Sequence, residues 1–306
     1  MNPQIKVIGA GGSGSNTISR MARFDGKGAE LIAVNTDAQS LHFCKCEKKI
    51  LIGKNITQGL GTGMDVNLGR QAAEESKNEI AEQIKGADMV FVTCGLGGGT
   101  GSGASPVIAE ISKSMGCLTV GVTTMPFSFE GEQRKKIAES AFDNLKNKVD
   151  SILVISNDKL LKVIDEKTTV SNAFLLCDEI LHQAVGGITD LILAPGIINI
   201  DFASIVSILK NSGRALFGVG RAAGENRAVE AAEKAINSPL LDFSIKGAKS
   251  ILFSVSGNDI TLNEISESAK VITENVDPNA QIIFGAVKDN NLRKGEIKIS
   301  VIATNF

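Results

Sequence analysis

Glycine and hydroxyl residues are concentrated in one short segment, residues 95–103, which reads Gly-Leu-Gly-Gly-Gly-Thr-Gly-Ser-Gly. The apolar run Met89–Val92 precedes it, and a helical pattern follows over 104–114. Because glycine lacks a Cβ, the backbone N–H groups of such a turn can approach a ligand closely and form a nest for an anion. The free N–H groups and the dipole of the following helix also favour phosphate. A flexible linker is the alternative, but linkers rarely lie between a buried strand and a helix.

Two more glycine clusters suggest a nucleotide. Gly9–Gly14 follows the first predicted strand and fits Gly-x-Gly-x-x-Gly, the dinucleotide fingerprint, with Asp37 as a candidate ribose ligand. An NAD(P)-dependent oxidoreductase is therefore one hypothesis. However, Gly59–Gly63 adds a third glycine-rich turn, and three such turns would surround a polyphosphate rather than one pyrophosphate. The lysine of the P-loop motif is missing, so backbone N–H groups and helix dipoles would hold the phosphates, with Mg²⁺ on the nucleotide offsetting their charge.

The totals exclude several classes of protein. The chain has 306 residues and a formal net charge of −2, without the basic balance of a nucleic-acid-binding protein. No apolar run is long enough to cross a membrane, and the N-terminus lacks the pattern of a signal peptide. We therefore expect no nucleic-acid partner, no direct membrane insertion and a cytoplasmic location.

The cysteines and histidines do not indicate a catalytic or metal site. The five cysteines are scattered and odd in number, so a disulfide framework is not expected. His42, Cys44 and Cys46 lie close together and suggest zinc, but there is no second ligand cluster, and His182 is the only other histidine. We therefore predict reduced thiols, no metal site and no Ser/His or Cys/His catalysis.

The hydrophobic pattern predicts an α/β protein. Strand patterns over 5–8, 30–34, 50–52, 89–93, 119–122 and 151–155 alternate with helical patterns over 15–24, 69–85, 105–115 and 132–149. This alternation predicts a Rossmann-like, doubly wound parallel sheet. A long helix is predicted over 171–193, with Ser171 as its N-cap and Pro195-Gly196 after its end. Its expected buried stripe comprises Phe174, Cys177, Leu181, Ala184, Ile188 and Leu191.

The last third of the chain predicts a smaller α/β or α+β domain. Helical patterns cover 202–211, 224–236 and 262–275, and strand patterns cover 215–220, 248–256, 281–287 and 297–303. The chain therefore divides into residues 1–170, the helix 171–194 and residues 195–306.

Gly97–Gly103 matches the signature of the tubulin/FtsZ family. Segments that resemble further FtsZ blocks follow in the same order, namely 35–39, 59–63, 126–131, 156–161, 199–203 and 301–304. The chain resembles bacterial-type FtsZ proteins, the tubulin homologues of cell division, from about Lys6 to Phe306. The resemblance implies a GTP-binding domain over 1–170, a core helix over 171–194 and a GTPase-activating domain over 195–306. It also implies head-to-tail filaments, GTP hydrolysis and a place in the mid-cell division ring.

The resemblance assigns roles to residues of the glycine turns and their surroundings. Thr62 and Gly63 would approach the γ-phosphate, Glu130 would accept from the ribose hydroxyls, and Arg134 would lie near ribose and phosphates. For Glu130 and Arg134 the alternative is a solvated turn and helix start. The residues implied around the phosphates are Gly11, Gly12, Ser13, Gly14, Ser15, Asn16, Gly97, Gly98, Gly99, Thr100 and Gly101.

Phe174 and Asp178 are four residues apart and so share one helix face. A phenyl ring can pack on a purine, and a carboxylate can accept from the N1–H and 2-amino donors of guanine, a pair that adenine lacks. Asn16 and Asn157 would complete the contacts to the base edge. The alternative for Phe174 is ordinary core packing.

No residue within 1–170 resembles a base that could activate water. The resemblance implies that the loop 195–203, with Asn199 and Asp201, completes the GTP site of the next subunit. The family's Asp-Phe-Ala-Asp is replaced here by Asp201-Phe202-Ala203-Ser204. Losing one general base costs about 10²-fold in rate, so we expect slow hydrolysis with polymerisation retained. A GTP-dependent filament that does not hydrolyse is the alternative.

Members of the family commonly continue into a disordered linker and a short peptide that binds membrane tethers. The sequence stops at Phe306. We therefore expect tether binding to depend on a peptide that is absent from this chain.

Overall fold

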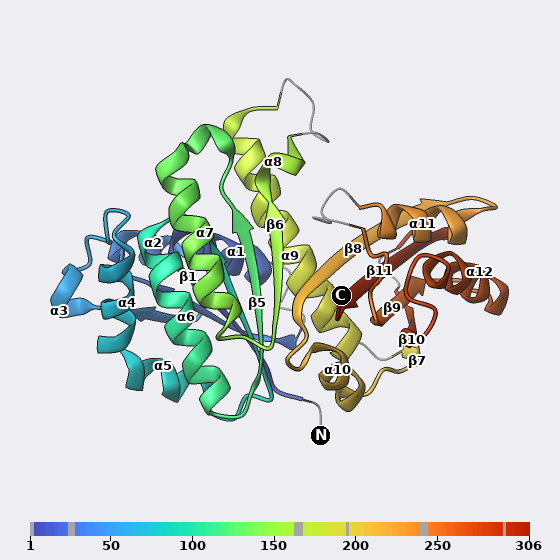
Figure 1. Cartoon of the computed structure of the whole chain (residues 1–306), viewed down its shortest axis with the longest axis horizontal. Coiled ribbons are helices and arrows are strands. Elements are labelled where there is room, and N and C mark those ends of the chain that lie inside the picture. The colour runs from blue at the N-terminus through green and yellow to red at the C-terminus, as the bar shows by residue number, and fades with distance from the viewer. Residues whose placement is uncertain (1–2, 24–27, 162–167, 194–195, 239–243, 290–291) are drawn as a thin grey trace. The chain divides into compact units, whose positions relative to one another are not determined.

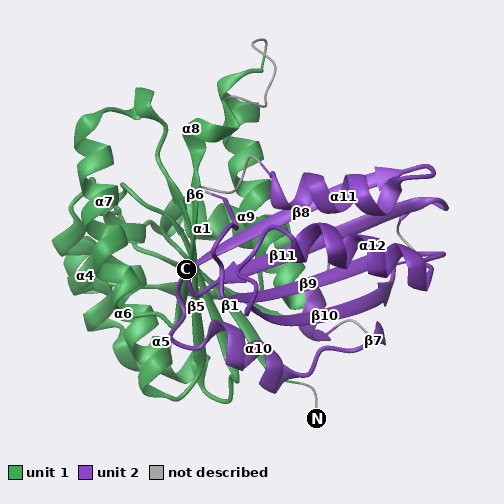
Figure 2. Ribbon diagram, turned by 45° about the vertical axis from the view of Figure 1, so that its right-hand side comes forward, with its two compact units in different colours: residues 1–189 green, residues 190–306 purple. Residues whose placement is uncertain are grey.

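The chain forms two compact units, residues 1–189 and 190–306 (Figure 2). The computed structural model describes residues 3–23, 28–161, 168–193, 196–238, 244–289 and 292–306. Phe24 and Pro195, which were predicted near helix ends, lie outside these ranges. The α/β architecture of the first unit and the mixed α/β architecture of the second confirm the predicted fold class. The division at 170 and 194 remains a prediction.

A parallel sheet forms the centre of the first unit. Its strand order is β3-β2-β1-β4-β5-β6, and every neighbouring pair is parallel. The strands are β1 (Ile5–Ala10), β2 (Glu30–Asn35), β3 (Lys48–Leu51), β4 (Met89–Gly95), β5 (Leu118–Met125) and β6 (Ser151–Ser156). Because β1 pairs with β2 on one side and with β4 on the other, the strand order reverses between β1 and β4. Parallel sheets bind ligands at the carboxyl ends of strands at such a reversal.

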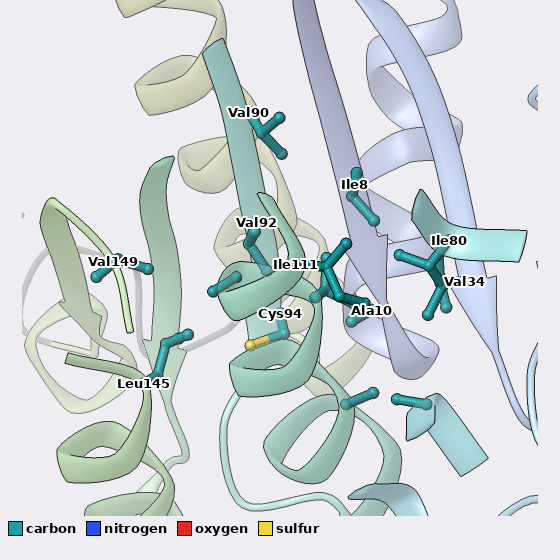
Figure 3. Close-up of a cluster of buried hydrophobic side chains, with 14 of the residues drawn as sticks. Ile8, Ala10, Val34, Ile80, Val90, Val92, Cys94, Ile111, Leu145 and Val149 are labelled. Atoms are coloured by element: carbon teal, nitrogen blue, oxygen red, sulfur yellow. The ribbon is translucent and has the colours of Figure 1, made fainter. Parts of the chain in front are cut away.

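Helices cover this sheet. α6 and α7 lie beside each other over β5 (Figure 1), and α1 packs against β1, β2 and β4. The core between strands and helices includes Ile8, Val92 and Ile111 (Figure 3), each no more than 3% exposed. The helices are α1 (Gly11–Met21), α2 (Ala38–Phe43), α3 (Lys54–Thr57), α4 (Val66–Glu75), α5 (Lys77–Ile84), α6 (Gly99–Ser114), α7 (Glu132–Lys146), α8 (Asn157–Leu160) and α9 (Val170–Leu193), with the 3₁₀ turn η2 (Ser128–Glu130).

Two predicted helix boundaries in this unit are wrong. The single helix expected over 69–85 is interrupted at Ser76, which has φ −97° and ψ 15°. The Ser76 hydroxyl accepts a hydrogen bond from the N–H of Gly53 at 3.2 Å, so a tertiary contact coincides with the break. The helix expected to begin at 104 or 105 begins at Gly99, so part of the glycine segment is helical.

The start of α9 also differs from the prediction. Thr169, rather than Ser171, caps the helix, because its Oγ1 accepts from the N–H of Asn172 at 3.2 Å. Phe174 is 39% exposed and does not belong to the buried stripe. The remaining predicted members of that stripe, Cys177, Leu181, Ala184, Ile188 and Leu191, are all buried.

The second unit contains a mixed sheet in the order β8-β11-β9-β10-β7. Among the strands that the structure describes in this unit, only β9 and β10 pair in parallel. The strands are β7 (Gly196–Ile198), β8 (Gly213–Ala223), β9 (Ser250–Gly257), β10 (Gln281–Lys288) and β11 (Glu296–Thr304), and the helices are α10 (Phe202–Leu209), α11 (Arg227–Ile236) and α12 (Leu262–Thr273). β7 lies where a loop was expected, and it forms by antiparallel pairing with β10. Among the described residues, no helix is long and apolar enough to cross a membrane.

Candidate functional site

A pocket lies at the carboxyl ends of β1, β4 and β5, within the first unit. The glycine turns 9–14 and 95–103 border it, together with residues from the segment after β5, α7, α8 and α9. Its lining consists of Ala10, Gly12, Ser13, Thr62, Gly95, Leu96, Gly98, Gly99, Thr100, Gly101, Thr124, Pro126, Glu130, Arg134, Asn157 and Phe174. The pocket therefore lies at the reversal of strand order, where the sheet topology predicts a ligand.

Two helix N-termini border the pocket. α1 begins directly after β1 and α6 begins within the glycine segment 95–103, and neither N-cap residue, Ala10 or Gly98, makes a side-chain capping bond. By contrast, the carboxylates of Asp37 and Asp65 cap α2 and α4. The first N–H groups of α1 and α6 therefore lack the side-chain acceptor that caps usually supply. Such N–H groups and the two helix dipoles are suited to binding a phosphate chain.

Glycine allows the two turns to touch. Gly11 has φ +73°, and a Cβ on it would lie 2.8 Å from the backbone N of Gly101. A Cβ on Gly95 would lie 2.8 Å from the Cβ of Ser13. At Gly98, which lines the pocket, an added Cβ would meet no protein atom within 4 Å. The open space at Gly98 therefore faces room that a ligand can fill.

Other glycines of the two motifs serve packing instead. A Cβ on Gly14 would lie 2.7 Å from the carbonyl oxygen of Thr93, and a Cβ on Gly103 would lie 2.6 Å from the N of Arg70. Gly99 likewise has Asp65 backbone atoms 2.8 Å from its Cβ position. These positions bring α1 close to the sheet and α6 close to α4. The motif therefore combines a binding turn with helix packing.

Three threonine hydroxyls meet beneath the second turn. Thr100 Oγ1 is 2.6 Å from Thr36 Oγ1 and 3.3 Å from Thr62 Oγ1, and all three residues are buried. The structure brings two of the predicted site residues, Thr62 and Thr100, to the pocket lining. Gly63, which was assigned with Thr62, is exposed and is not a lining residue.

Glu130 and Arg134 form an ion pair at the pocket wall. Arg134 Nη1 lies 3.0 Å from Glu130 Oε2, and Glu130 Oε1 accepts from the N–H of Phe127 at 2.8 Å. Arg134 packs against Gly97, whose Cβ position is 2.8 Å from the Arg134 Cγ. Its Nε is buried and has no partner among the described residues. The two residues therefore belong to the pocket and are not merely a solvated turn.

Phe174 and Asn157 also line the pocket. Phe174 meets Phe127 edge to face with ring centroids 5.3 Å apart. Asn157 is 5% exposed, and its Oδ1 is buried without a partner in the described part of the chain. An accessible ring and an unsatisfied amide oxygen in the same pocket match what a planar, hydrogen-bonding base needs.

Asp178 lies one turn of α9 beyond Phe174. It is 8% exposed and is not itself a lining residue. Its Oδ2 is 3.6 Å from Nε of Arg20 on α1. Burial raises the pKa of Asp178 to about 6, although the Arg20 charge acts in the opposite direction. The carboxylate therefore stays ionised at neutral pH but lies close to titration.

The structure brings most of the predicted nucleotide-binding residues to one pocket. Those outside its lining are Gly11, Gly14, Ser15, Asn16, Gly63, Gly97 and Asp178. Of the other lining residues, Ala10, Gly95, Leu96 and Pro126 lie in segments that the sequence analysis singled out but were not assigned as site residues, and Thr124 was missed altogether. These residues lie at or just after the ends of β1, β4 and β5, so the rule for open parallel sheets was the signal that could have found them.

Asn199 and Asp201 belong to the second unit. Both are exposed, and both side chains bond to nearby backbone. Asn199 Oδ1 accepts from the N–H of Gly196 at 2.7 Å, and Asp201 Oδ1 accepts from the N–H of Ser204 at 2.6 Å. Hydrogen bonds from Ser204 lower the pKa of Asp201. Asp201 is thus the N-cap of α10, and Ser204, at the departure from the family motif, is its direct partner.

The structure gives little support to the two alternative sites, a dinucleotide site with Asp37 and a zinc site at His42, Cys44 and Cys46. The Asp37 carboxylate accepts from the N–H of Ser40 at 2.9 Å as the cap of α2, so it is already engaged and does not point to a dinucleotide ribose. Among the described residues, no three His, Cys, Asp or Glu side chains are grouped to hold a metal ion.

Comparisons with known proteins agree with this architecture. Residues 4–165 match the model of the tubulin/FtsZ family GTPase domain, and residues 213–306 match the FtsZ family C-terminal domain. The chain is 52% identical to cell division protein FtsZ 1 of Pyrococcus horikoshii, covering 99% of this chain and 81% of that protein. It is 50% identical to the Thermococcus kodakarensis protein of the same name, covering 98% and 80%.

Solved structures give the same result. An FtsZ dimer of M. jannaschii has a TM-score of 0.95 and 45% identity, covering 99% of this chain and 88% of that one. CetZ2 of Haloferax volcanii, at 22% identity and a TM-score of 0.84 over 98% and 92% of the chains, shows the shared fold alone. The resemblance in the sequence is confirmed: the chain belongs to the tubulin/FtsZ family, as an FtsZ cell-division protein with a tubulin-like GTPase domain.

Proposed function

We propose that this protein binds GTP in the pocket described above, polymerises head to tail, and hydrolyses GTP at a site that the next subunit completes. The observation that carries the proposal is the meeting of two helix N-termini without side-chain caps, those of α1 and α6, at the reversal of strand order. Membership of a GTPase family and the M. jannaschii FtsZ dimer support GTP binding and self-association.

The phosphates of GTP or GDP would accept hydrogen bonds from N–H groups of both turns. Gly12, Ser13 and the segment 98–101 supply these donors. Arg134 would add positive charge and its unpaired Nε, while Glu130 holds the guanidinium and accepts from the ribose. Mg²⁺ would be carried by the nucleotide phosphates and offset their charge, which is consistent with the lack of an acidic cluster among the described residues.

The base would lie against the Phe174 ring. Asn157 Oδ1 and the Asp178 carboxylate are acceptors that suit the N1–H and amino group of guanine, and Asn16 would complete the edge contacts. Asp178 would reach the base from just behind the pocket lining. With adenine, these buried acceptors would remain unpaired, and sites of this kind reject the wrong ligand by about 10⁴-fold.

Hydrolysis would require Asn199 and Asp201 of a second copy of this chain. An exposed carboxylate can orient the attacking water through position and charge. Since Ser204 cannot replace an acid as a base, we propose slow turnover in assembled filaments. A filament that binds GTP without hydrolysing it is the second candidate, and Ser204 is the observation that favours it.

Sedimentation with GTP and Mg²⁺ beside GDP and ATP controls tests the proposal. We expect filaments with GTP alone, and phosphate release per subunit that rises steeply with protein concentration. Equal turnover in dilute and assembled protein would exclude a shared site. Failure to bind GTP in calorimetry would exclude the pocket assignment, and filaments without phosphate release would favour the second candidate.

Other partners follow from family membership alone. We propose a role at the mid-cell division ring and recruitment by a membrane tether through a peptide beyond Phe306. Joining such a peptide to this chain and measuring its binding to a tether protein, with the peptide alone as a control, tests the second point.

A further inference from the structure

Two cysteines face each other in the connection between α2 and β3. The Sγ atoms of Cys44 and Cys46 are 3.6 Å apart. Cys44 is 6% exposed, whereas Cys46 is half-buried and also lines a surface cavity with Lys45, Lys48 and Glu30. One thiol of the pair is therefore accessible to a small molecule, and the other lies directly behind it.

The surroundings of Cys44 favour a thiolate. Cys46 hydrogen-bonds to its sulfur, the Ser19 hydroxyl donates to it at 3.1 Å, and Lys49 adds positive charge nearby. These contacts outweigh burial and lower the pKa of Cys44 to about 6. The same contact, together with burial, raises the pKa of Cys46. Cys44 is therefore the thiol of the pair that ionises more readily.

The other three cysteines have different environments. Cys94, Cys117 and Cys177 are buried. Burial raises the pKa of Cys94 to about 11 and that of Cys177 to about 12, and it also raises the pKa of Cys117. Buried, protonated thiols react poorly, so the chain contains its own internal controls.

We propose that Cys44 and Cys46 form a redox-active thiol pair, which a small-molecule disulfide converts to an intramolecular disulfide. The half-buried Cys46 attacks one sulfur of the small disulfide and passes its proton to the other, which leaves as a thiol. The Cys44 thiolate then attacks Cys46 Sγ, forms the bridge and expels the second half of the small disulfide as a thiolate. Both electrons that leave the protein thiols reduce the small disulfide, so the exchange balances.

Bridge formation changes contacts of α1. The sulfurs must approach to about 2.05 Å, so the Cys44 sulfur must move from its present contacts. In the reduced protein that thiol lies 3.3 Å from the carbonyl oxygen of Ser15 and 3.1 Å from the hydroxyl of Ser19. The site is separate from the GTP pocket, so the proposal does not depend on the nucleotide assignment.

Oxidised glutathione tests this proposal on the intact protein. We expect a species lighter by two hydrogen atoms, with Cys44 and Cys46 protected from alkylation. Because trypsin cuts after Lys45, the two peptides should remain joined and separate only on reduction. The pair should react at least ~10-fold faster than any other cysteine of the folded protein, because it joins an accessible thiol, Cys46, to a neighbour whose pKa is lowered, Cys44. A persistent glutathione adduct without a bridge, a faster reaction at Cys94, Cys117 or Cys177, or full alkylation of all five cysteines would each overturn the proposal.

Variants separate the two steps. Cys44→Ser should stop at a stable glutathione adduct on Cys46, whereas Cys117→Ser should form the bridge as the unmodified protein does. A Cys44→Ser protein without an adduct would contradict Cys46 as the entry point. The mapping of the unmodified protein decides the matter even if a variant fails to fold.

Discussion

At the scale of single residues, Asp178 illustrates how a side chain proposed to contact a ligand can lower the stability of the ligand-free protein. The carboxylate is 8% exposed and has Arg20 as its ion-pair partner at 3.6 Å. Its pKa of about 6 lies above the ordinary value of 3.8, so the folded protein without ligand is penalised for keeping it ionised at neutral pH. A ligand with two hydrogen-bond donors would remove much of that penalty.

Replacing this acid with an amide should therefore stabilise the ligand-free protein. Asp178→Asn should raise the free energy of unfolding at pH 7 by about 1–3 kcal/mol, since one pKa unit corresponds to about 1.4 kcal/mol. Because the folded-state pKa is raised, the gain should shrink as the pH falls from 6 towards 4. Urea unfolding at both pH values checks this, and the exposed Asp143→Asn should show no such change. A gain independent of pH would contradict the assigned pKa.

Arg20 should determine the pH below which GTP binding weakens. Its charge lowers the pKa of Asp178, so Arg20→Met should raise that pKa and weaken GTP binding at a pH about 1 unit higher than in the unmodified protein. Calorimetry with GTP from pH 5 to 8 measures the shift. Arg20→Lys keeps the charge and should stay near the original profile. Identical profiles for all three proteins would exclude Arg20 as the positioning partner.

The sequence predicted which residues lie at the pocket better than it predicted their burial and hydrogen bonding. Asn157 and Phe174 were predicted as base contacts, and the structure places both in the pocket. The prediction that Phe174 is buried was wrong. A spacing of three and four residues identifies one face of a helix, but it does not show whether other elements cover that face near the end of the helix. The unpaired atoms of Asn157 and Arg134 depend on distant chain segments, so the sequence offered no sign of them.

At the scale of elements, most strands and helices of the sheet were predictable. Apolar runs such as that of β4 occur because parallel strands are buried on both faces. The break at Ser76 and the strand β7 were not predictable, since each depends on a partner remote in sequence, Gly53 and β10 respectively. The start of α6 within the glycine segment was also missed, because glycine has a low helix propensity that packing against α4 overrides.

The close contact between α4 and α6 can be tested with a matched pair of glycine-to-alanine substitutions. Gly103→Ala should destabilise the protein by about 1–3 kcal/mol, because its Cβ would overlap backbone of α4. Gly98→Ala should leave stability within about 0.5 kcal/mol, since its Cβ meets open space, as in ordinary surface changes. The second variant should nevertheless weaken GTP binding by filling the pocket. Urea unfolding and calorimetry distinguish the two effects, and equal destabilisation by both variants would contradict the packing assignment.

At the scale of the whole molecule, family membership was recognisable because its motifs are spread over both units. The nucleotide residues lie in residues 1–189, and Asn199 and Asp201 lie in residues 190–306. In our proposal the hydrolytic site requires two copies, so the sequence of one chain could not supply its geometry.

Restoring an acid in α10 tests this shared site. Ser204→Asp should raise phosphate release per subunit in filaments by about 10²-fold, the scale of one general base. The backbone N–H of residue 204, which donates to the capping carboxylate of Asp201, is kept in the variant. The start of α10 should therefore survive. Ser207→Asp adds the same charge to the same helix and should not raise the rate. If both variants release phosphate at the original rate while pelleting normally, Ser204 is not the cause of slow turnover.

The N-termini of α1 and α6, which have no side-chain caps, also bear on how the protein should be handled in solution. The backbone N–H groups at these two N-termini can donate to any tetrahedral oxyanion, so they do not distinguish a nucleotide phosphate from inorganic sulfate. Sulfate buffers should therefore compete with GTP, and the apparent dissociation constant should increase with sulfate concentration but not with chloride at matched ionic strength. Amide hydrogen exchange at Gly12 and Gly99 should slow in sulfate as well as with nucleotide, so the choice of buffer would determine what an affinity measurement reports.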